Sequence, residues 1–262
     1  MANFWKVFVL AMAARFVKIE PLARALALAL VSGKNLLMWG PGGHGKSEAT
    51  QFALRLVRRS GNDCFVQSFG EGMTEDRLWG GVDLQVLDRE NLVRYRTEDS
   101  FLAAKTAVFE ELFDAPAVVL LSLKDTVQAR ELRNGAQRVK MHTEVLFGLT
   151  NKEPTEVADL GPAAQALLER FPLQMRVAWE SYSSTDYADL FRMVGTWDET
   201  PAPVEGGMAA KLEEARALYK RVSLNGMEAI LAELLAKAGE RGNPISPRSA
   251  AHAAGIVRAA AA

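Results

Sequence analysis

Short apolar runs alternate with segments of helical periodicity through the first two thirds of the chain. Buried parallel strands appear in sequence as continuous apolar runs, because helices cover both faces of their sheet. This alternation predicts an α/β fold in which a parallel sheet lies between two layers of helices. The predicted strands are residues 35–39, 64–69, 106–109, 145–149 and 173–177.

Two segments interrupt this alternation, residues 82–96 and 131–142. In both, apolar and polar residues alternate, which is the period of a strand with one buried face. Turn-forming residues stand near the middle of each, at 88–91 and at Asn134-Gly135. We expect two β-hairpins inserted into the main fold.

The C-terminal part of the chain is predicted to be helical. Proline and glycine gather at 200–207, and the residues beyond have helical patterns at 208–222, 226–238 and 247–262. We therefore expect a domain of residues 1–200, which contains both hairpins, and a small all-helical domain of residues 201–262.

The loop Gly40–Ser47 reads GPGGHGKS and stands between a predicted strand and a predicted helix. It fits the phosphate-binding pattern G-x-x-x-x-G-K-[ST] in full. Glycines let the backbone N–H groups approach a phosphate, and the helix start adds its positive dipole end. Lys46 then supplies a charge for the β- and γ-phosphates, and Ser47 a hydroxyl ligand for Mg²⁺. The alternative, a chance glycine turn before a helix, explains fewer of these features.

Two adjacent carboxylates, Glu110 and Glu111, follow the strand at 106–109. Hydrolysis at a P-loop needs one acid for the metal and one to polarise the attacking water. Glu110 fits the first task and Glu111 the second. The alternative is a pair of solvated acids at a helix start, where the dipole favours them.

Three further polar residues are candidates for the same site. Asn151 follows the strand at 145–149 and could hold the attacking water, although a turn residue before Pro154 is an equal alternative. Arg170 lies at a helix end, where a cation is favoured by the dipole alone. Arg248 lies at a helix start, where a cation is disfavoured, so a role in ligand binding explains it better.

Composition limits the class of protein. The chain has 262 residues, a formal net charge of -1 and one cysteine, Cys64. The near-neutral charge makes nucleic acid an unlikely partner. A single cysteine and the absence of a long apolar segment favour a soluble cytoplasmic protein without a membrane span.

The order of these motifs resembles the AAA+ ATPases, and within them the MoxR group, over about residues 20–258. The resemblance implies a three-layer parallel-sheet P-loop domain with a small C-terminal helical lid, and a homo-hexamer that uses ATP and Mg²⁺. It implies that Ser47 and Glu110 hold the metal, and that Glu111, Asn151 (sensor 1) and Arg170 (arginine finger) are catalytic. It implies nucleotide contacts from Gly40, Pro41, Gly42, Gly43, His44, Gly45, Lys46, Ser47, Glu48 and Arg248 (sensor 2).

Three positions depart from the family pattern. Glu110 replaces the usual aspartate, Asp114 stands where the group usually has an arginine, and His44 replaces a small residue in the loop. The first change affects the metal contact, and the second removes or reverses a contact expected between subunits.

We expect an oligomeric ATPase that remodels or activates a partner protein, as MoxR-like proteins generally do, often with a von Willebrand factor A-type adaptor. Glu110 and Asp114 leave open a regulatory or scaffold subunit with weak or no hydrolysis. A GTP-binding switch is the third alternative, since Asn151-Lys152 is similar to a guanine-reading signature, but Pro154 occupies the place of the required aspartate.

Overall fold

The computed structural model describes residues 4–59, 61–178, 182–194, 207–241 and 245–262. Its internal contacts divide the chain into two compact units. We call Asn35–Tyr182 the sheet unit, and Met1–Lys34 together with Ser183–Ala262 the helical unit.

The sheet unit contains the predicted parallel sheet. Its strand order is β2-β3-β6-β1-β7, and every neighbouring pair in it is parallel. Because the strands run the same way, their carboxyl ends meet at one edge of the sheet, which we call the carboxyl edge. All the predicted strands are confirmed, with the bounds β1 Leu36–Trp39, β2 Cys64–Ser68, β3 Thr106–Glu110, β6 Val145–Thr150 and β7 Leu173–Arg176.

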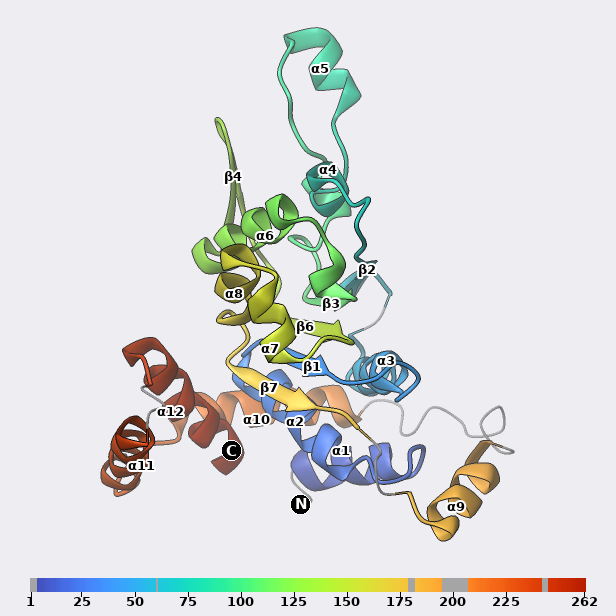
Figure 1. The fold of residues 1–262 in the computed structure, drawn as a ribbon, viewed down its shortest axis with the longest axis vertical. Helices are drawn as coiled ribbons and strands as arrows, with labels where there is room; N and C mark the ends of the chain where they lie inside the picture. Colours follow the sequence, from blue (N-terminus) through green and yellow to red (C-terminus); the bar gives the residue numbers. More distant parts are fainter. Residues whose placement is uncertain (1–3, 60, 179–181, 195–206, 242–244) are drawn as a thin grey trace. The chain divides into compact units, whose positions relative to one another are not determined.

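Helices cover both faces of this sheet, which confirms the three-layer prediction. The helix α3 (Lys46–Leu56) lies on one face, and α7 (Pro154–Asp159) and α8 (Pro162–Leu168) lie on the other (Figure 1). The helix α6 (Ala117–Ala129) packs against α8. Apolar side chains from these layers form the buried core, whose largest members include Trp79, Phe101, Phe109, Phe147 and Phe171.

The prediction of a hairpin at residues 82–96 is wrong. The segment forms the helix α5 (Leu84–Glu90), and its two arms meet only in an isolated antiparallel bridge between Val82 and Tyr95. The Asp83 side chain accepts hydrogen bonds from the backbone N–H groups of the first turn, and Asn91 ends the helix with a φ of 52°. These two capping residues stabilise a helix more effectively than the weak alternation stabilises two strands.

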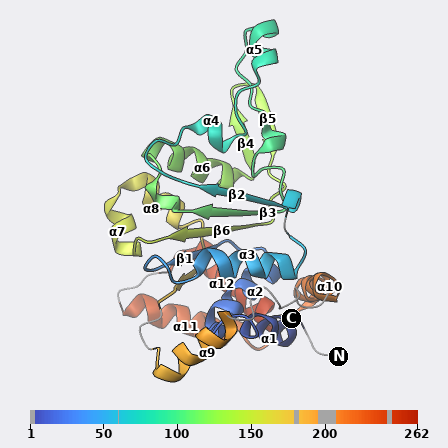
Figure 2. The same ribbon diagram turned by 90° about the vertical axis from the view of Figure 1, so that its right-hand side faces the viewer.

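The second insertion is the predicted hairpin. The strands β4 (Glu131–Asn134) and β5 (Gln137–Lys140) pair antiparallel around a turn at Gly135, whose φ is 54°. The Gln137 side chain both donates to and accepts from the backbone of Tyr95, at 2.9 and 3.1 Å. The two insertions are thus joined, and they lie together at one end of the sheet unit (Figure 2).

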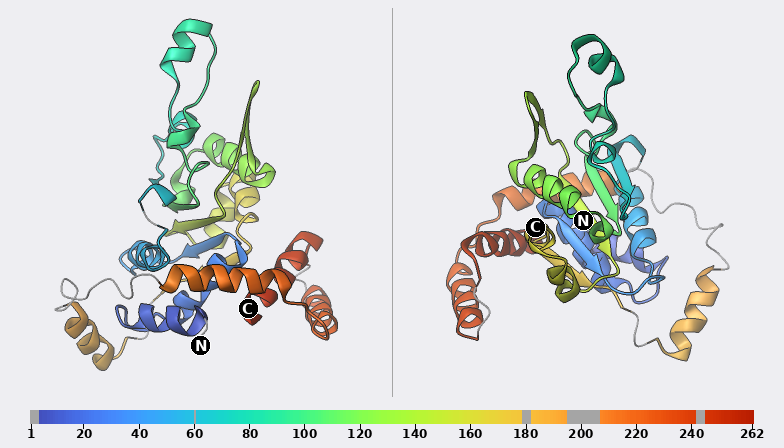
Figure 3. Two further views of the ribbon diagram at one scale, coloured as in Figure 1. Left: turned by 180° about the vertical axis from the view of Figure 1, so that it is seen from behind. Right: turned by 45° about the horizontal axis from the view of Figure 1, so that its top comes forward.

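Helices alone make up the described part of the helical unit, and α2 contacts α1, α10 and α12. The predicted C-terminal helices are confirmed as α10, α11 and α12 (Figure 3). The predicted boundary near residue 200 lies outside the described residues, and the contacts group residues 1–34 with the C-terminal helices. The helices are α1 Phe4–Ala13, α2 Glu20–Ser32, α9 Ser184–Val194, α10 Gly207–Arg221, α11 Glu228–Glu240 and α12 Pro247–Ala261. No helix in the described ranges is long and apolar enough to cross a membrane.

Candidate functional site

The glycine loop connects the end of β1 to the start of α3 at the carboxyl edge of the sheet. Gly43 and Gly45 have φ values of 78° and 70°, in the left-handed region that side chains other than glycine rarely adopt. Gly45 is also the N-cap of α3. A Cβ atom at either glycine would meet no atom within 4 Å, so this side of the loop is open. The loop has the form and the free space of an anion cradle at a helix start.

Gly40 has a different role, because it packs against β7. Its φ is 139°, and a Cβ atom built on it would lie 2.2 Å from the carbonyl oxygen of Val177. Gly40 therefore allows the loop to leave β1 in close contact with the neighbouring strand.

We expect Gly40→Ala to destabilise the sheet unit strongly, because the variant combines backbone strain with a clash against backbone. Gly61→Ala is the matched control, since Gly61 also has a positive φ, 61°, but no atom within 4 Å of its Cβ position. The clash should make Gly40→Ala about 1–3 kcal/mol more destabilising than the control. Urea unfolding measures both variants, and equal losses would contradict this account of Gly40.

Lys46 is buried, with 7% of its surface exposed. Its ammonium group donates to the carbonyl oxygens of Gly40 and Pro41 at 2.5 and 2.8 Å and to Oδ1 of Asn151 at 3.0 Å. Burial lowers the pKa of this lysine, and the negative charge of Glu111 opposes that shift. The carbonyl oxygens of the loop thus hold the Lys46 ammonium group in a fixed position.

Asn151 links Lys46 to Glu111. Its Nδ2 atom donates to Oε1 of Glu111 over 2.7 Å, while its Oδ1 accepts from Lys46. Glu111 has a φ of 49°, which is uncommon for a residue with a side chain. Lysine, amide and carboxylate therefore form one hydrogen-bonded chain from the start of α3, through the residue after β6, to the residue after β3.

A pocket of about 340 Å³ lies over this chain. It brings together most of the residues singled out from the sequence, including both glutamates, the asparagine and the loop. Leu149 also lines it, which the sequence did not indicate, since an apolar strand residue carries no chemical signal. The lining residues are Gly42, Gly43, His44, Gly45, Lys46, Ser47, Glu48, Glu110, Glu111, Leu149 and Asn151.

The residues of this pocket fit a nucleoside triphosphate with Mg²⁺. The open glycines and buried Lys46 suit a polyphosphate, and the Ser47 hydroxyl and Glu110 carboxylate are hard oxygen donors of the kind Mg²⁺ prefers. The described residues hold no cluster of three or more His, Cys, Asp or Glu side chains that could bind a metal. A P-loop site needs no such cluster, because Mg²⁺ uses one or two protein ligands together with phosphate oxygens and water.

Arg170 does not line this pocket. It lies just before β7, where its backbone oxygen accepts a hydrogen bond from Asn35, the residue before β1. Arg170 is therefore at the amino edge of the sheet, roughly 13 Å of strand away from the loop. The guanidinium donates to Oε1 of Gln128 on α6 at 2.6 Å, and 12% of the side chain is exposed.

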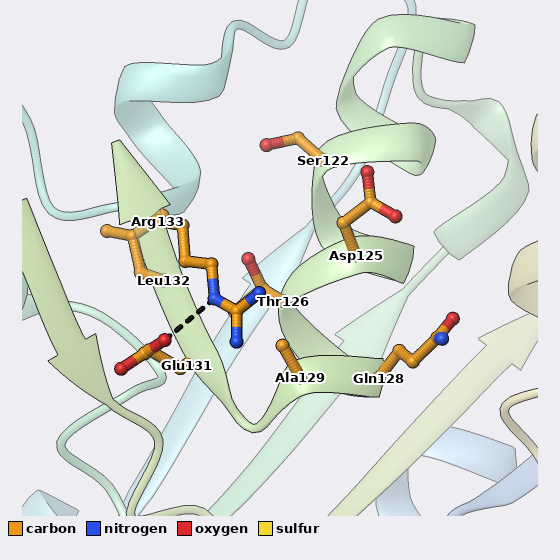
Figure 4. Close-up of a pocket in the computed structure, with 8 residues that line it drawn as sticks. All are labelled: Ser122, Asp125, Thr126, Gln128, Ala129, Glu131, Leu132 and Arg133. Carbon is orange, nitrogen blue, oxygen red and sulfur yellow. Dashed lines mark hydrogen bonds and ion pairs between the residues drawn. The ribbon is translucent and has the colours of Figure 1, made fainter. Parts of the chain in front are cut away.

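A second pocket, of about 590 Å³, lies between α6 and β4. Gln128, the partner of Arg170, is one of its lining residues, together with Asp125 on the same helix and Arg133 on β4 (Figure 4). The Arg133 guanidinium pairs with Glu131 at 2.7 Å. Most of the lining is polar or charged, unlike the apolar lining common in small-molecule sites.

Arg248 lies in the helical unit, in the first turn of α12. Ser246 caps this helix by accepting from the backbone N–H of Ser249, and Arg248 is exposed. Its predicted contact with nucleotide stays a prediction.

Two polar contacts, one beside the pocket and one at the amino edge of the sheet, were not found from the sequence. The Lys152 ammonium pairs with the Asp114 carboxylate, beside the link between Asn151 and Glu111. Asn35 bridges β6 and β7, since it donates to the Arg170 oxygen and accepts from the Leu146 N–H at 3.0 Å. An asparagine directly before a buried strand was the available signal for the second contact, and no local pattern indicated the first.

The strand order, the glycine loop and the buried lysine together define a P-loop domain of the AAA+ type. A family model described as the MoxR domain in the MoxR-vWA-beta-propeller ternary systems matches residues 6–220. The crystal structure of a candidate ATPase from Cytophaga hutchinsonii has a similar fold, with a TM-score of 0.70. The match covers 97% of this chain and 78% of that one, at 15% sequence identity. The chain belongs to the MoxR family of AAA+ ATPases.

Proposed function

We propose that this chain binds ATP with Mg²⁺ in the glycine-loop pocket and hydrolyses it. The observation that supports this most directly is the hydrogen-bonded chain from Lys46 through Asn151 to Glu111, which runs along one pocket. A polyphosphate needs the cation at one end of that chain, and an attacking water needs the carboxylate at the other.

The residues divide the chemistry between them. The loop amides and the Lys46 ammonium bind the phosphates. Glu111 accepts a proton from the attacking water, and Asn151 orients both that water and the carboxylate through its amide. Ser47 and Glu110 would hold Mg²⁺, which supplies charge neutralisation on the phosphates. Glu110 is one methylene longer than aspartate, and it lines the same pocket as Ser47, which supports a shared role in holding the metal.

The active form is proposed to be a homo-hexamer in which Arg170 acts on ATP held by the neighbouring subunit. Two observations support an action between subunits: Arg170 lies at the edge of the sheet opposite its own loop, and its Nε has no hydrogen-bond partner within the described part of the chain. Arg248 is proposed to contact the nucleotide from the helical unit.

The work done with ATP is proposed to be the remodelling or activation of a partner protein. The matching family is described as part of systems that contain a vWA protein and a β-propeller. We therefore propose a vWA-domain protein as the adaptor. This step rests on the family description, whereas nucleotide binding rests on the pocket.

Lys46→Ala should abolish ATP binding, because it removes the one buried cation that the loop folds around among the described pocket residues. At an ATP concentration 100 times its Kd, ligand binding stabilises the wild type by about 2.7 kcal/mol. Thermal unfolding should therefore show a clear rise in Tm with ATP and Mg²⁺ for the wild type and none for the variant. Titration calorimetry with ATP and GTP gives the nucleotide preference.

Lys105→Ala is the matched control for this experiment. Lys105 pairs with Asp63 at the amino edge of the sheet, away from the pocket, and more than half of its side chain is exposed. Its variant should keep the full ATP-dependent shift. A Lys46→Ala protein that binds ATP as tightly as the wild type would refute the proposed site. Binding without phosphate release at any protein concentration would favour a regulatory subunit instead.

A further inference from the structure

Two side-chain links join the segments that follow β3 and β6 at the carboxyl edge. The first is the hydrogen bond from Asn151 to Glu111, which lines the pocket. The second is the ion pair between Lys152 and Asp114, whose residues do not line the pocket. Both links connect the same two segments, and the second is one residue further from β6 and three residues further from β3. The two links are therefore neighbours that connect the same pair of segments.

Hydrogen bonds from backbone N–H groups connect the Asp114–Lys152 ion pair to the Asn151–Glu111 link on both segments. The Asp114 N–H donates to the carbonyl oxygen of Glu111 over 2.9 Å, which closes the short turn η3 (Leu112–Asp114). On the other side, the Lys152 N–H donates to the hydroxyl of Thr150 over 3.1 Å, and Thr150 is buried. These hydrogen bonds connect the ion pair to the backbone segments that carry Glu111 and Asn151, so a change in the Asp114–Lys152 separation can be transmitted to both.

Glu111 needs such support because of its backbone. A residue with a side chain in the left-handed region is destabilised by about 1–2 kcal/mol, and it stays there only when its surroundings hold it. Relaxation of this turn would swing the carboxylate away from the amide. The ion pair opposes this movement of Glu111, because it connects Asp114, the last residue of the turn, to Lys152 after β6.

Charge gives a second reason for the pair. Asp114 adds a third carboxylate within four residues of Glu110 and Glu111, beside a pocket proposed to accept polyphosphate. Lys152 neutralises it within the same subunit. Both side chains are about one third exposed, at 34% each, so solvent screens the attraction only in part.

We propose that Asp114 and Lys152 form a positioning pair that holds the Glu111 carboxylate against Asn151. What matters for turnover is that the two positions carry opposite charges, in either order. This inference rests on the proposed ATPase function. It adds the ion pair that holds the Glu111 carboxylate in position for that function.

A charge swap tests the pair. Asp114→Lys and Lys152→Asp each place like charges face to face, so each should lower kcat on the order of 10- to 100-fold, as expected for a misplaced catalytic group. ATP affinity should shift with the added charge, upward in Asp114→Lys and downward in Lys152→Asp, whereas kcat should fall in both. The double variant Asp114→Lys/Lys152→Asp should recover most of the lost kcat. Phosphate release at saturating ATP measures kcat, and calorimetry measures affinity.

The pair Asp63–Lys105 provides a matched control. It also links two segments next to adjacent strands, those that precede β2 and β3 at the amino edge, with 3.1 Å between Lys105 Nζ and Asp63 Oδ2. Its two single variants and its swap should leave kcat unchanged. Single variants at 114 and 152 that keep wild-type kcat, or a swap as slow as either single, would overturn the proposal.

Hydrogen exchange separates this proposal from the proposed function. The protection factor of the residue-114 amide, which corrects for the intrinsic exchange rate of each side chain, should be lower in both single variants than in the wild type and should return to the wild-type value in the swap. A wild type that releases no phosphate refutes the ATPase function, while the exchange pattern still reports on the pair. Unchanged protection in the single variants refutes the pair, whatever the ATPase rate.

Discussion

Replacing Arg170 with alanine is expected to lower ATP turnover by about 10³- to 10⁵-fold while ATP binding is kept, as for arginine fingers in other nucleotide hydrolases. The guanidinium stabilises charge that develops on the transferred phosphate only in the transition state, so its loss affects kcat. Phosphate release at high protein concentration, where the oligomer is assembled, measures the effect.

Mixing two inactive variants tests whether Arg170 acts between subunits. An Arg170→Ala subunit keeps Glu111, and a Glu111→Gln neighbour keeps Arg170, so their shared site is complete when the arginine acts on the neighbour. The mixture should then hydrolyse ATP although each variant alone does not. Arg133→Ala is the control, because Arg133 is an exposed arginine on β4. Full activity of assembled Arg170→Ala, or no recovery on mixing, would contradict the assignment.

Glu111→Gln is expected to keep ATP binding and to lower turnover by about 10²- to 10⁴-fold, the usual contribution of a general base. Glutamine keeps the length of the side chain and can still accept the hydrogen bond from Asn151 that holds it in place. It lacks the negative charge that accepts a proton from water. Single-turnover hydrolysis with protein in excess over ATP isolates this step from product release.

Asp125→Asn is the control for this charge removal. Asp125 is an exposed carboxylate on α6 that pairs with Lys124, and it does not line the glycine-loop pocket. Its variant should turn over ATP at the wild-type rate. Normal hydrolysis by Glu111→Gln would show that another group activates the water. Where hydrolysis is lost as expected, the same variant should hold ATP and retain a partner protein, which makes it the form to use for partner identification.

The strands and most helices were predictable because their signals are local. A buried parallel strand must be apolar along its whole length, so 145–149 and 106–109 are recognisable without knowledge of their neighbours. The glycine loop is local as well, since its glycines, Lys46 and Ser47 occur within eight consecutive residues. The same reasoning failed at 82–96, where the alternation was given more weight than the Asp83 cap that starts α5.

The amino-acid sequence by itself determined the parallel sheet, the phosphate-binding loop and the presence of two acids after β3. The tertiary structure alone decided which polar groups meet. The links Asn151–Glu111, Lys152–Asp114 and Gln128–Arg170 join residues 40, 38 and 42 positions apart. Such contacts depend on which strands are neighbours and on their register, and no local pattern records either. The glycine loop is therefore visible in the sequence, whereas the arrangement proposed to hydrolyse ATP is formed only when β3 and β6 lie side by side.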